Sequence, residues 1–215
     1  MARPVSPINA GSMADIAFLL LIFFLVTTTM DVNQGITRML PPLLEEDVTP
    51  PEIKKRNVLI VLVNSADQLL VNNKFMEIGD LRREAVEFFT NPMNSEELPE
   101  TELLSERIDR ARESGDTARY NSLRRTLDVL GEDVMVSKGV ISLQNDRGTS
   151  YKMYIQVQDE LARAITEIRN DLSQRLWSVR FTDMKEETAG DRITAIQTVV
   201  PAAISEAEPK NIGGN

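Results

Sequence analysis

Asp15 is a lone carboxylate at the start of the most apolar stretch of this 215-residue chain. The segment 12–30 is rich in Leu, Ile and Phe, and no charged residue follows Asp15 before Asp31. At ~1.5 Å per residue, the uncharged run from Ile16 to Met30 spans only ~22 Å of a hydrocarbon layer ~30 Å thick. We therefore predict a transmembrane helix over residues 12–30, with Asp15 within the bilayer or at its edge.

An ionisable group in a membrane helix is costly, so its default interpretation is functional. A carboxylate in a dry helix interface resists ionisation, whereas water or polar partner groups favour its charged form. Alternating exposure to the two sides of a membrane would let Asp15 take a proton from one side and release it to the other. Each crossing is worth ~2.3 kcal/mol per ~100 mV. One helix cannot build two access paths, so this chemistry requires partner proteins.

Three other interpretations of the stretch stay open. Arg3 and the apolar run 16–26 resemble the start of a secretory signal peptide, although no A-x-A-like cleavage site follows. Ser12 and Asp15 have the spacing of a capping box, which would place them at the start of a helix. The segment could also be a simple anchor with Asp15 in the headgroup zone. A capping role and a proton-carrying role for Asp15 are compatible.

The run from Asn9 to Leu25, NAGSMADIAFLLLIFFL, resembles the N-terminal signature of the ExbD/TolR biopolymer-transport family. Proteins of this family pair a lone membrane Asp with a single helix rich in Leu, Ile and Phe. The small-residue turn and the Ser-Met pair before Asp15 resemble the ExbD-like proteins of Bacteroidetes. The resemblance is strong over residues 5–30 and weaker over 57–89 and 140–177. One helix with one Asp also occurs in the flagellar stator subunit MotB, but no OmpA-like peptidoglycan motif is visible here.

The resemblance implies a subunit of a motor driven by the proton motive force, with Asp15 as the proton-translocating residue. It implies a pentamer of an ExbB/TolQ-like multi-span protein around a homodimer of this chain, and an exported domain that passes motion to a TonB-like coupling protein. A TolR-like role in envelope maintenance and a plain anchored interaction module are the alternatives. We expect the face of the helix that carries Asp15 to pack against the pentamer or the second copy. Its members are Ser12, Phe18, Leu19, Ile22, Val26 and Thr29.

Composition argues against other classes of function. The net charge of −9 disfavours binding to nucleic acid. The absence of His and Cys removes the commonest catalytic base, the commonest metal ligand and all thiol chemistry. There is no phosphate-binding loop, no nucleophile elbow and no metalloprotease motif. We expect no enzymatic activity, no cofactor and no metal site.

The remaining sequence divides by composition. Residues 1–11 form a short leader whose Arg3 points weakly to a cytoplasmic N-terminus. Residues 31–56 hold Pro41-Pro42 and Pro50-Pro51 around an acidic patch, which favours an extended linker. Residues 57–207 would form the exported, periplasmic domain, and 208–215 a C-terminal tail. The resemblance supports this orientation, with the chain crossing the inner membrane once and contacting its lipid.

We predict a two-layer α+β fold for the outer domain, with helices on one face of a sheet. The run 58–63 and residues 68–72 predict two strands joined by a tight turn. A helix should follow, with Asp80 as its N-cap, and the insertion 91–138 should form a hairpin of two amphipathic helices around Gly115. A strand over 140–145, a long helix containing the apolar series 154–176, a helix over 191–199 and a short strand over 203–207 complete the predicted fold.

Overall fold

The structure is a computed structural model that describes residues 10–28 and 54–207. The chain divides into two compact units, residues 1–50 and 51–215. In the first unit the described residues form one helix, α1 (Ala10–Thr28). The predicted linker 31–56 lies outside the described residues except for 54–56. Lys54 and the short 3-10 helix η1 (Lys55–Asn57) open the described part of the second unit.

The second unit is organised around a five-stranded sheet in the order β3-β2-β1-β6-β7. The strands are β1 (Val58–Val63), β2 (Leu69–Val71), β3 (Lys74–Met76), β6 (Val140–Asn145) and β7 (Ile204–Glu206). The predicted hairpin is confirmed, because β1 and β2 pair antiparallel with Leu62 opposite Leu70. The pairs β1–β6 and β6–β7 are parallel, with Val61 opposite Leu143 and Ser142 opposite Ser205. Parallel neighbours need long connections, and helices provide them here.

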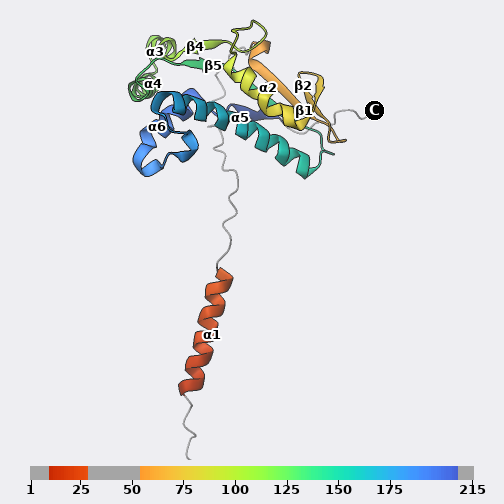
Figure 1. Cartoon of the computed structure of the whole chain (residues 1–215), viewed down its shortest axis with the longest axis vertical. Coiled ribbons are helices and arrows are strands. Elements are labelled where there is room, and N and C mark those ends of the chain that lie inside the picture. Colours follow the sequence, from red (N-terminus) through yellow and green to blue (C-terminus); the bar gives the residue numbers. More distant parts are fainter. Residues whose placement is uncertain (1–9, 29–53, 208–215) are drawn as a thin grey trace, which may run out of the picture. The chain divides into compact units, whose positions relative to one another are not determined.

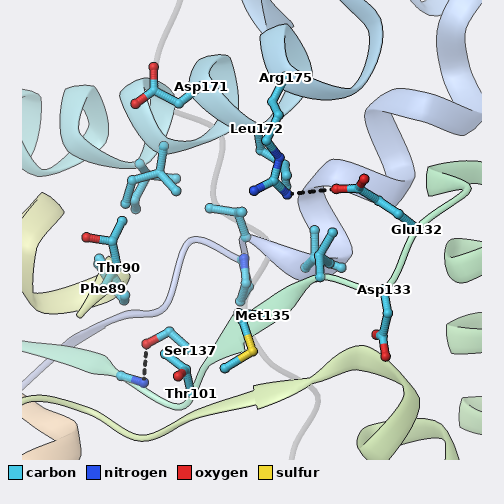
Figure 2. Close-up of a pocket in the computed structure, with 17 residues that line it drawn as sticks. Phe89, Thr90, Thr101, Glu132, Asp133, Met135, Ser137, Asp171, Leu172 and Arg175 are labelled. Carbon is cyan, nitrogen blue, oxygen red and sulfur yellow. Dashed lines mark hydrogen bonds and ion pairs between the residues drawn. The ribbon is translucent and has the colours of Figure 1, made fainter. Parts of the chain in front are cut away.

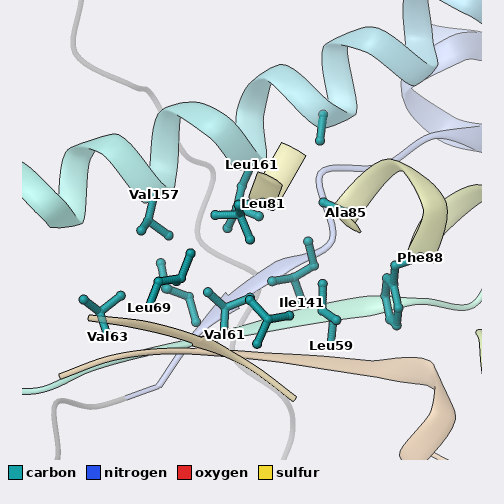
Figure 3. Packing of buried hydrophobic residues seen from close by; sticks show 13 residues of the cluster. Leu59, Val61, Val63, Leu69, Leu81, Ala85, Phe88, Ile141, Val157 and Leu161 are labelled. Carbon is teal, nitrogen blue, oxygen red and sulfur yellow. The ribbon is translucent and has the colours of Figure 1, made fainter. Parts of the chain in front are cut away.

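Helices α2 (Ile78–Thr90) and α5 (Tyr151–Trp177) lie side by side on the sheet (Figure 1). Figure 3 shows Val157 and Leu161 of α5 above alternate side chains of the strands. In β1 every second residue, from Leu59 to Val63, is buried, because successive side chains of a strand point to opposite faces. The predicted α+β fold with helices packed on one sheet face is confirmed in this unit.

The insertion forms a second core beside the sheet. Helices α3 (Leu104–Glu113) and α4 (Thr117–Leu130) are the predicted hairpin, and Gly115 between them has φ of +74°. Helix α6 (Glu186–Val199) packs against α4, after a short 3-10 helix, η2 (Phe181–Asp183). Leu104, Leu123 and Ile196 are among the buried residues of this second cluster.

Several local expectations were wrong. The N-cap of α2 is Glu77, so Asp80 lies in the first turn rather than at the cap. Helix α6 begins at Glu186, five residues before the predicted start, and it contains a kink at Ala189. Strand β3 and a two-stranded ribbon made of β4 (Thr101–Leu103) and β5 (Met135–Ser137) were not predicted from the sequence. Each of these strands has three residues, which is too short for an alternating pattern to stand out.

Candidate functional site

Asp15 lies on α1, five residues after the start of the helix at Ala10. Phe18, Leu19 and Ile22 follow it at steps of three, four and seven residues, which places them on the same helix face as Asp15. Their side chains are 58%, 59% and 43% exposed. The exposure of Ser12 and Val26 is outside what the structure describes, and Thr29 lies beyond the described residues.

The capping interpretation of Asp15 is wrong in this structure. A capping box would place Ser12 at the N-cap and Asp15 at the third helical position. Helix α1 begins two residues before Ser12, and its first turn contains no acidic residue. Asp15 therefore lies in the second turn, where a carboxylate no longer satisfies the free N–H groups of the helix start.

The apolar side chains of α1 are exposed on every side of the helix. Ile16, Leu21 and Ile22 lie on three different faces of the helix, and they are 60%, 62% and 43% exposed. Within the residues that the structure describes, no helix combines the length and the apolar character required to cross a membrane. The transmembrane helix over residues 12–30 therefore stays a prediction.

In the second unit, carboxylates and cations gather where the described chain resumes after the linker. Glu100 accepts a hydrogen bond from Lys54 Nζ at 2.6 Å and another from Arg56 Nη2. The backbone N–H of Glu100 donates to Asn57 Oδ1 at 3.0 Å. The hydrogen bonds from Lys54 and Arg56 lower the pKa of Glu100 from 4.5 to about 2. The first described residues of this unit, Lys54 to Asn57, are thus bound to Glu100 in the insertion.

Glu102, the second residue of β4, belongs to the same group of charged side chains. Its side chain is 3% exposed, and its carboxylate contacts Arg107, Arg110 and Lys138 at 2.6, 2.7 and 3.1 Å. Burial raises the pKa of Glu102, but the hydrogen bonds from Arg110, Arg107 and Lys138 outweigh it and lower the pKa to about 2. Lys138 also reaches Glu100 at 3.3 Å, so both carboxylates belong to one network. We call Glu100, Glu102 and their five cations the β4 ion cluster. Sequence reasoning missed it, because its members are up to 84 residues apart.

The cluster has the features of a structural element. Each carboxylate is held by several cations, which stabilise its charged form instead of preparing it to exchange a proton near neutral pH. Among residues 10–28 and 54–207, no group of three or more acidic residues is placed to hold a metal ion.

A cavity of about 400 Å³ lies between β5 and α5 (Figure 2). Its wall includes apolar residues of α5, the last residue of α6 with the segment that follows it, and three acidic residues. The apolar members are Ile165, Ile168, Leu172, Val199, Val200 and Pro201, and the acidic members are Glu132, Asp133 and Asp171. Arg175 Nη2 lies 3.1 Å from Glu132 Oε1 on this wall. No local sequence pattern predicts this cavity, because it forms only where the insertion folds back beside α5.

Residues 2–169 match the family described as biopolymer transport protein ExbD/TolR. The chain belongs to this family. The match contains α1 with Asp15, the whole insertion and most of α5, while α6 and β7 lie beyond it. No curated protein matches the chain significantly. The family establishes a role in biopolymer transport or in an envelope-associated process, and members of the ExbD/TolR family generally work with ExbB/TolQ-type partners.

Proposed function

We propose that this protein is the single-helix subunit of a motor of the ExbB–ExbD type, driven by the proton motive force. Asp15 carries protons, and the output is TonB-dependent transport across the outer membrane. The observation that carries the proposal is a lone carboxylate on a helix whose apolar side chains are exposed on all sides. A helix of that kind requires lipid or other helices around it, and family membership supplies partners of the ExbB/TolQ type.

In this proposal α1, continued by residues 29–30, crosses the inner membrane with its N-terminus in the cytoplasm, and the second unit lies in the periplasm. The face with Asp15, Phe18, Leu19 and Ile22 packs in the centre of an ExbB/TolQ-like pentamer or against a second copy of this chain. The same face includes Ser12, Val26 and Thr29. Contacts at this face would alternately shield Asp15 from water and expose it to water. This alternation is the condition for Asp15 to bind a proton and then release it.

The connectivity of the chain indicates which part of the second unit would receive a motion of α1. The first described residues of the second unit, Lys54 to Asn57, lead directly into β1, which is the central strand of the sheet. Lys54 and Arg56 also bind Glu100 at the base of the insertion. A force transmitted along the linker would therefore act on the sheet and on the insertion together, and a TonB-like protein would receive it from this unit.

Proton conductance tests the proposal. The chain is assembled with its ExbB-like partner in vesicles under an imposed potential, as wild type, as Asp15→Asn and as Asp15→Glu. We expect conductance in the wild type, its loss in Asp15→Asn with assembly intact, and partial retention in Asp15→Glu, since Glu keeps a titratable carboxyl group. Equal conductance in wild type and Asp15→Asn would contradict the proposal and favour a plain anchored interaction module.

A TolR-like role in envelope maintenance uses the same proton chemistry and differs only in the output. Deletion of the gene distinguishes the two roles. Loss of TonB-dependent uptake with an intact envelope supports the ExbD-type role. Leakage of periplasmic proteins with normal uptake would instead assign the chain to envelope maintenance.

A further inference from the structure

Strand β5 has one free edge, and this edge borders the cavity. The ribbon contains only β4 and β5 among the described residues, so each strand has a single neighbour. One side of the cavity is lined by Met135 and Ser137 of β5 and by Gly139. The other side is lined by three residues of α5: Ile168, Leu172 and Arg175. Figure 2 shows Met135 and Ser137 on the strand and Arg175 on the helix across from it.

The hydrogen-bond register shows which backbone groups of β5 are unused. Leu104 N donates to Val134 O at 3.0 Å, and Lys138 N donates to Glu100 O at 2.9 Å. Val136 lies opposite Glu102, midway between these two bonds. Because hydrogen-bonded and non-hydrogen-bonded pairs alternate in an antiparallel ladder, Met135 and Ser137 direct their N–H and C=O groups away from β4. Within the described chain these groups have no backbone partner.

The cavity wall also carries a negative charge that is not compensated. Glu132 is paired with Arg175, and Asp133 accepts hydrogen bonds from Ser105, its backbone N–H at 3.0 Å and its hydroxyl. Asp171 is exposed on α5, and within the described residues it has no ion pair, since the neighbouring Arg175 pairs with Glu132. A cation brought into the cavity would therefore find Asp171 available.

We propose that the β5 edge and the adjoining cavity bind an extended peptide segment of a partner protein that carries apolar side chains and a lysine. The peptide adds as a strand to β5 through the backbone of Met135 and Ser137, which is how free sheet edges recognise peptides. Its apolar side chain occupies the space beside Leu172 and Val199, and its lysine pairs with Asp171. This docking surface belongs to the insertion and to α5, and it operates independently of proton transfer at Asp15.

A pair of substitutions at Met135 separates backbone pairing from side-chain contact. Met135→Pro removes the N–H that faces the cavity without removing a bond to β4, whereas Met135→Ala removes the side chain and keeps the N–H. The probe is a fluorescent peptide, acetyl-Lys-Leu-Lys-Leu-Lys-amide, titrated into the full chain in detergent. We expect wild type and Met135→Ala to bind within a fewfold of each other, and Met135→Pro to bind at least about tenfold more weakly, equivalent to ~1.4 kcal/mol.

Two matched controls test the chemistry of the probe. A peptide with N-methylated backbone amides cannot pair with an edge and should not bind. Asp171→Asn should weaken binding of the lysine peptide severalfold. It should leave the affinity for a serine-substituted analogue, acetyl-Ser-Leu-Ser-Leu-Ser-amide, unchanged. Amide hydrogen exchange of Ser137 in the wild type, with and without the peptide, gives a reading that does not depend on whether Met135→Pro folds. Slower exchange with the peptide supports the proposal.

Three results would overturn it. The first is equal affinity of Met135→Pro and Met135→Ala, with no change in exchange at Ser137. The second is failure of the probe to bind the wild type. The third is a change of oligomeric state in Met135→Pro but not in Met135→Ala, which would assign the edge to an interface between copies of this chain. A loss of proton conductance in Asp15→Asn is a separate result and does not bear on any of these outcomes.

Discussion

Arg107 Nε lies 2.6 Å from Oε1 of Glu102, and this contact joins α3 to a carboxylate on β4 that is almost completely buried. A buried carboxylate is costly unless cations and hydrogen-bond donors surround it. Arg107, Arg110 and Lys138 provide these groups for Glu102. The packing of α3 against the ribbon of β4 and β5 therefore depends in part on this acidic side chain.

Glu102→Gln should destabilise the second unit by about 1–3 kcal/mol, because it leaves three cations without their common partner. The measurement is the free energy of unfolding in urea. The matched control is Asp128→Asn, which removes a carboxylate from an exposed pair with Arg124 and should change stability by less than about 0.5 kcal/mol. Similar effects of the two substitutions would show that the β4 ion cluster contributes no more than a surface pair.

The cluster should also make stability depend on pH in the acid range. The pKa values of Glu100 and Glu102 are lowered from 4.5 to about 2 in the folded protein. A carboxylate with a lower pKa in the folded chain than in the unfolded chain stabilises the fold above the unfolded value, and this contribution is lost as pH falls toward the folded value. We expect the thermal midpoint of the wild type to fall between pH 4.5 and about 2, and the difference between wild type and Glu102→Gln to shrink over the same range. A difference that stays constant would contradict this origin.

Gly139 has no room for a side chain. A Cβ placed there would lie 2.8 Å from Phe88 Cε1 and 3.1 Å from both Pro99 Cγ and Ser137 Oγ. Gly139→Ala should therefore cost about 1–3 kcal/mol through overpacking. Gly79→Ala on α2 is the control, because no heavy atom lies within 4 Å of its added Cβ, and it should be neutral or slightly stabilising. The measurement is the free energy of unfolding of both variants in urea. An unchanged free energy in Gly139→Ala would be inconsistent with the tight contact.

Asn91 ends α2 in the left-handed conformation, with φ of 39°, and fixes the start of the insertion. Its side chain accepts from Ser95 N at 2.7 Å and donates to Pro99 O at 3.0 Å. Asn91→Gly keeps the backbone conformation but loses these hydrogen bonds, which should lower the stability by about 1–2 kcal/mol. Asn91→Ala should lower it by ~1 kcal/mol more, because Ala disfavours a positive φ. Asn94→Gly, at an exposed position with φ of 50°, should have little effect. Thermal unfolding of the three variants gives the order of their stabilities. A smaller loss of stability in Asn91→Ala than in Asn91→Gly would contradict this role of the left-handed conformation.

Local pattern was enough to predict part of this protein. The lone Asp15 before an apolar run, the β-branched run of β1 and the spacing of apolar residues in α5 are signals within a few turns of chain, and α1, β1 and α5 follow them. The family signature around Asp15 is equally local, and the match over residues 2–169 confirms it.

Tertiary structure alone decided the rest. The parallel register of β1 and β6 joins residues 82 apart in sequence, Val58 with Val140 among them, and no local period encodes such a pairing. The β4 ion cluster arises where Lys54 meets Glu100, and the cavity beside β5 arises where Met135 and Leu172 line the same space; both bring together distant segments of the chain. Strands of three residues bury too few side chains to leave a pattern, so β4 and β5 form only because the insertion and α6 enclose Val134 and Val136 in a shared core.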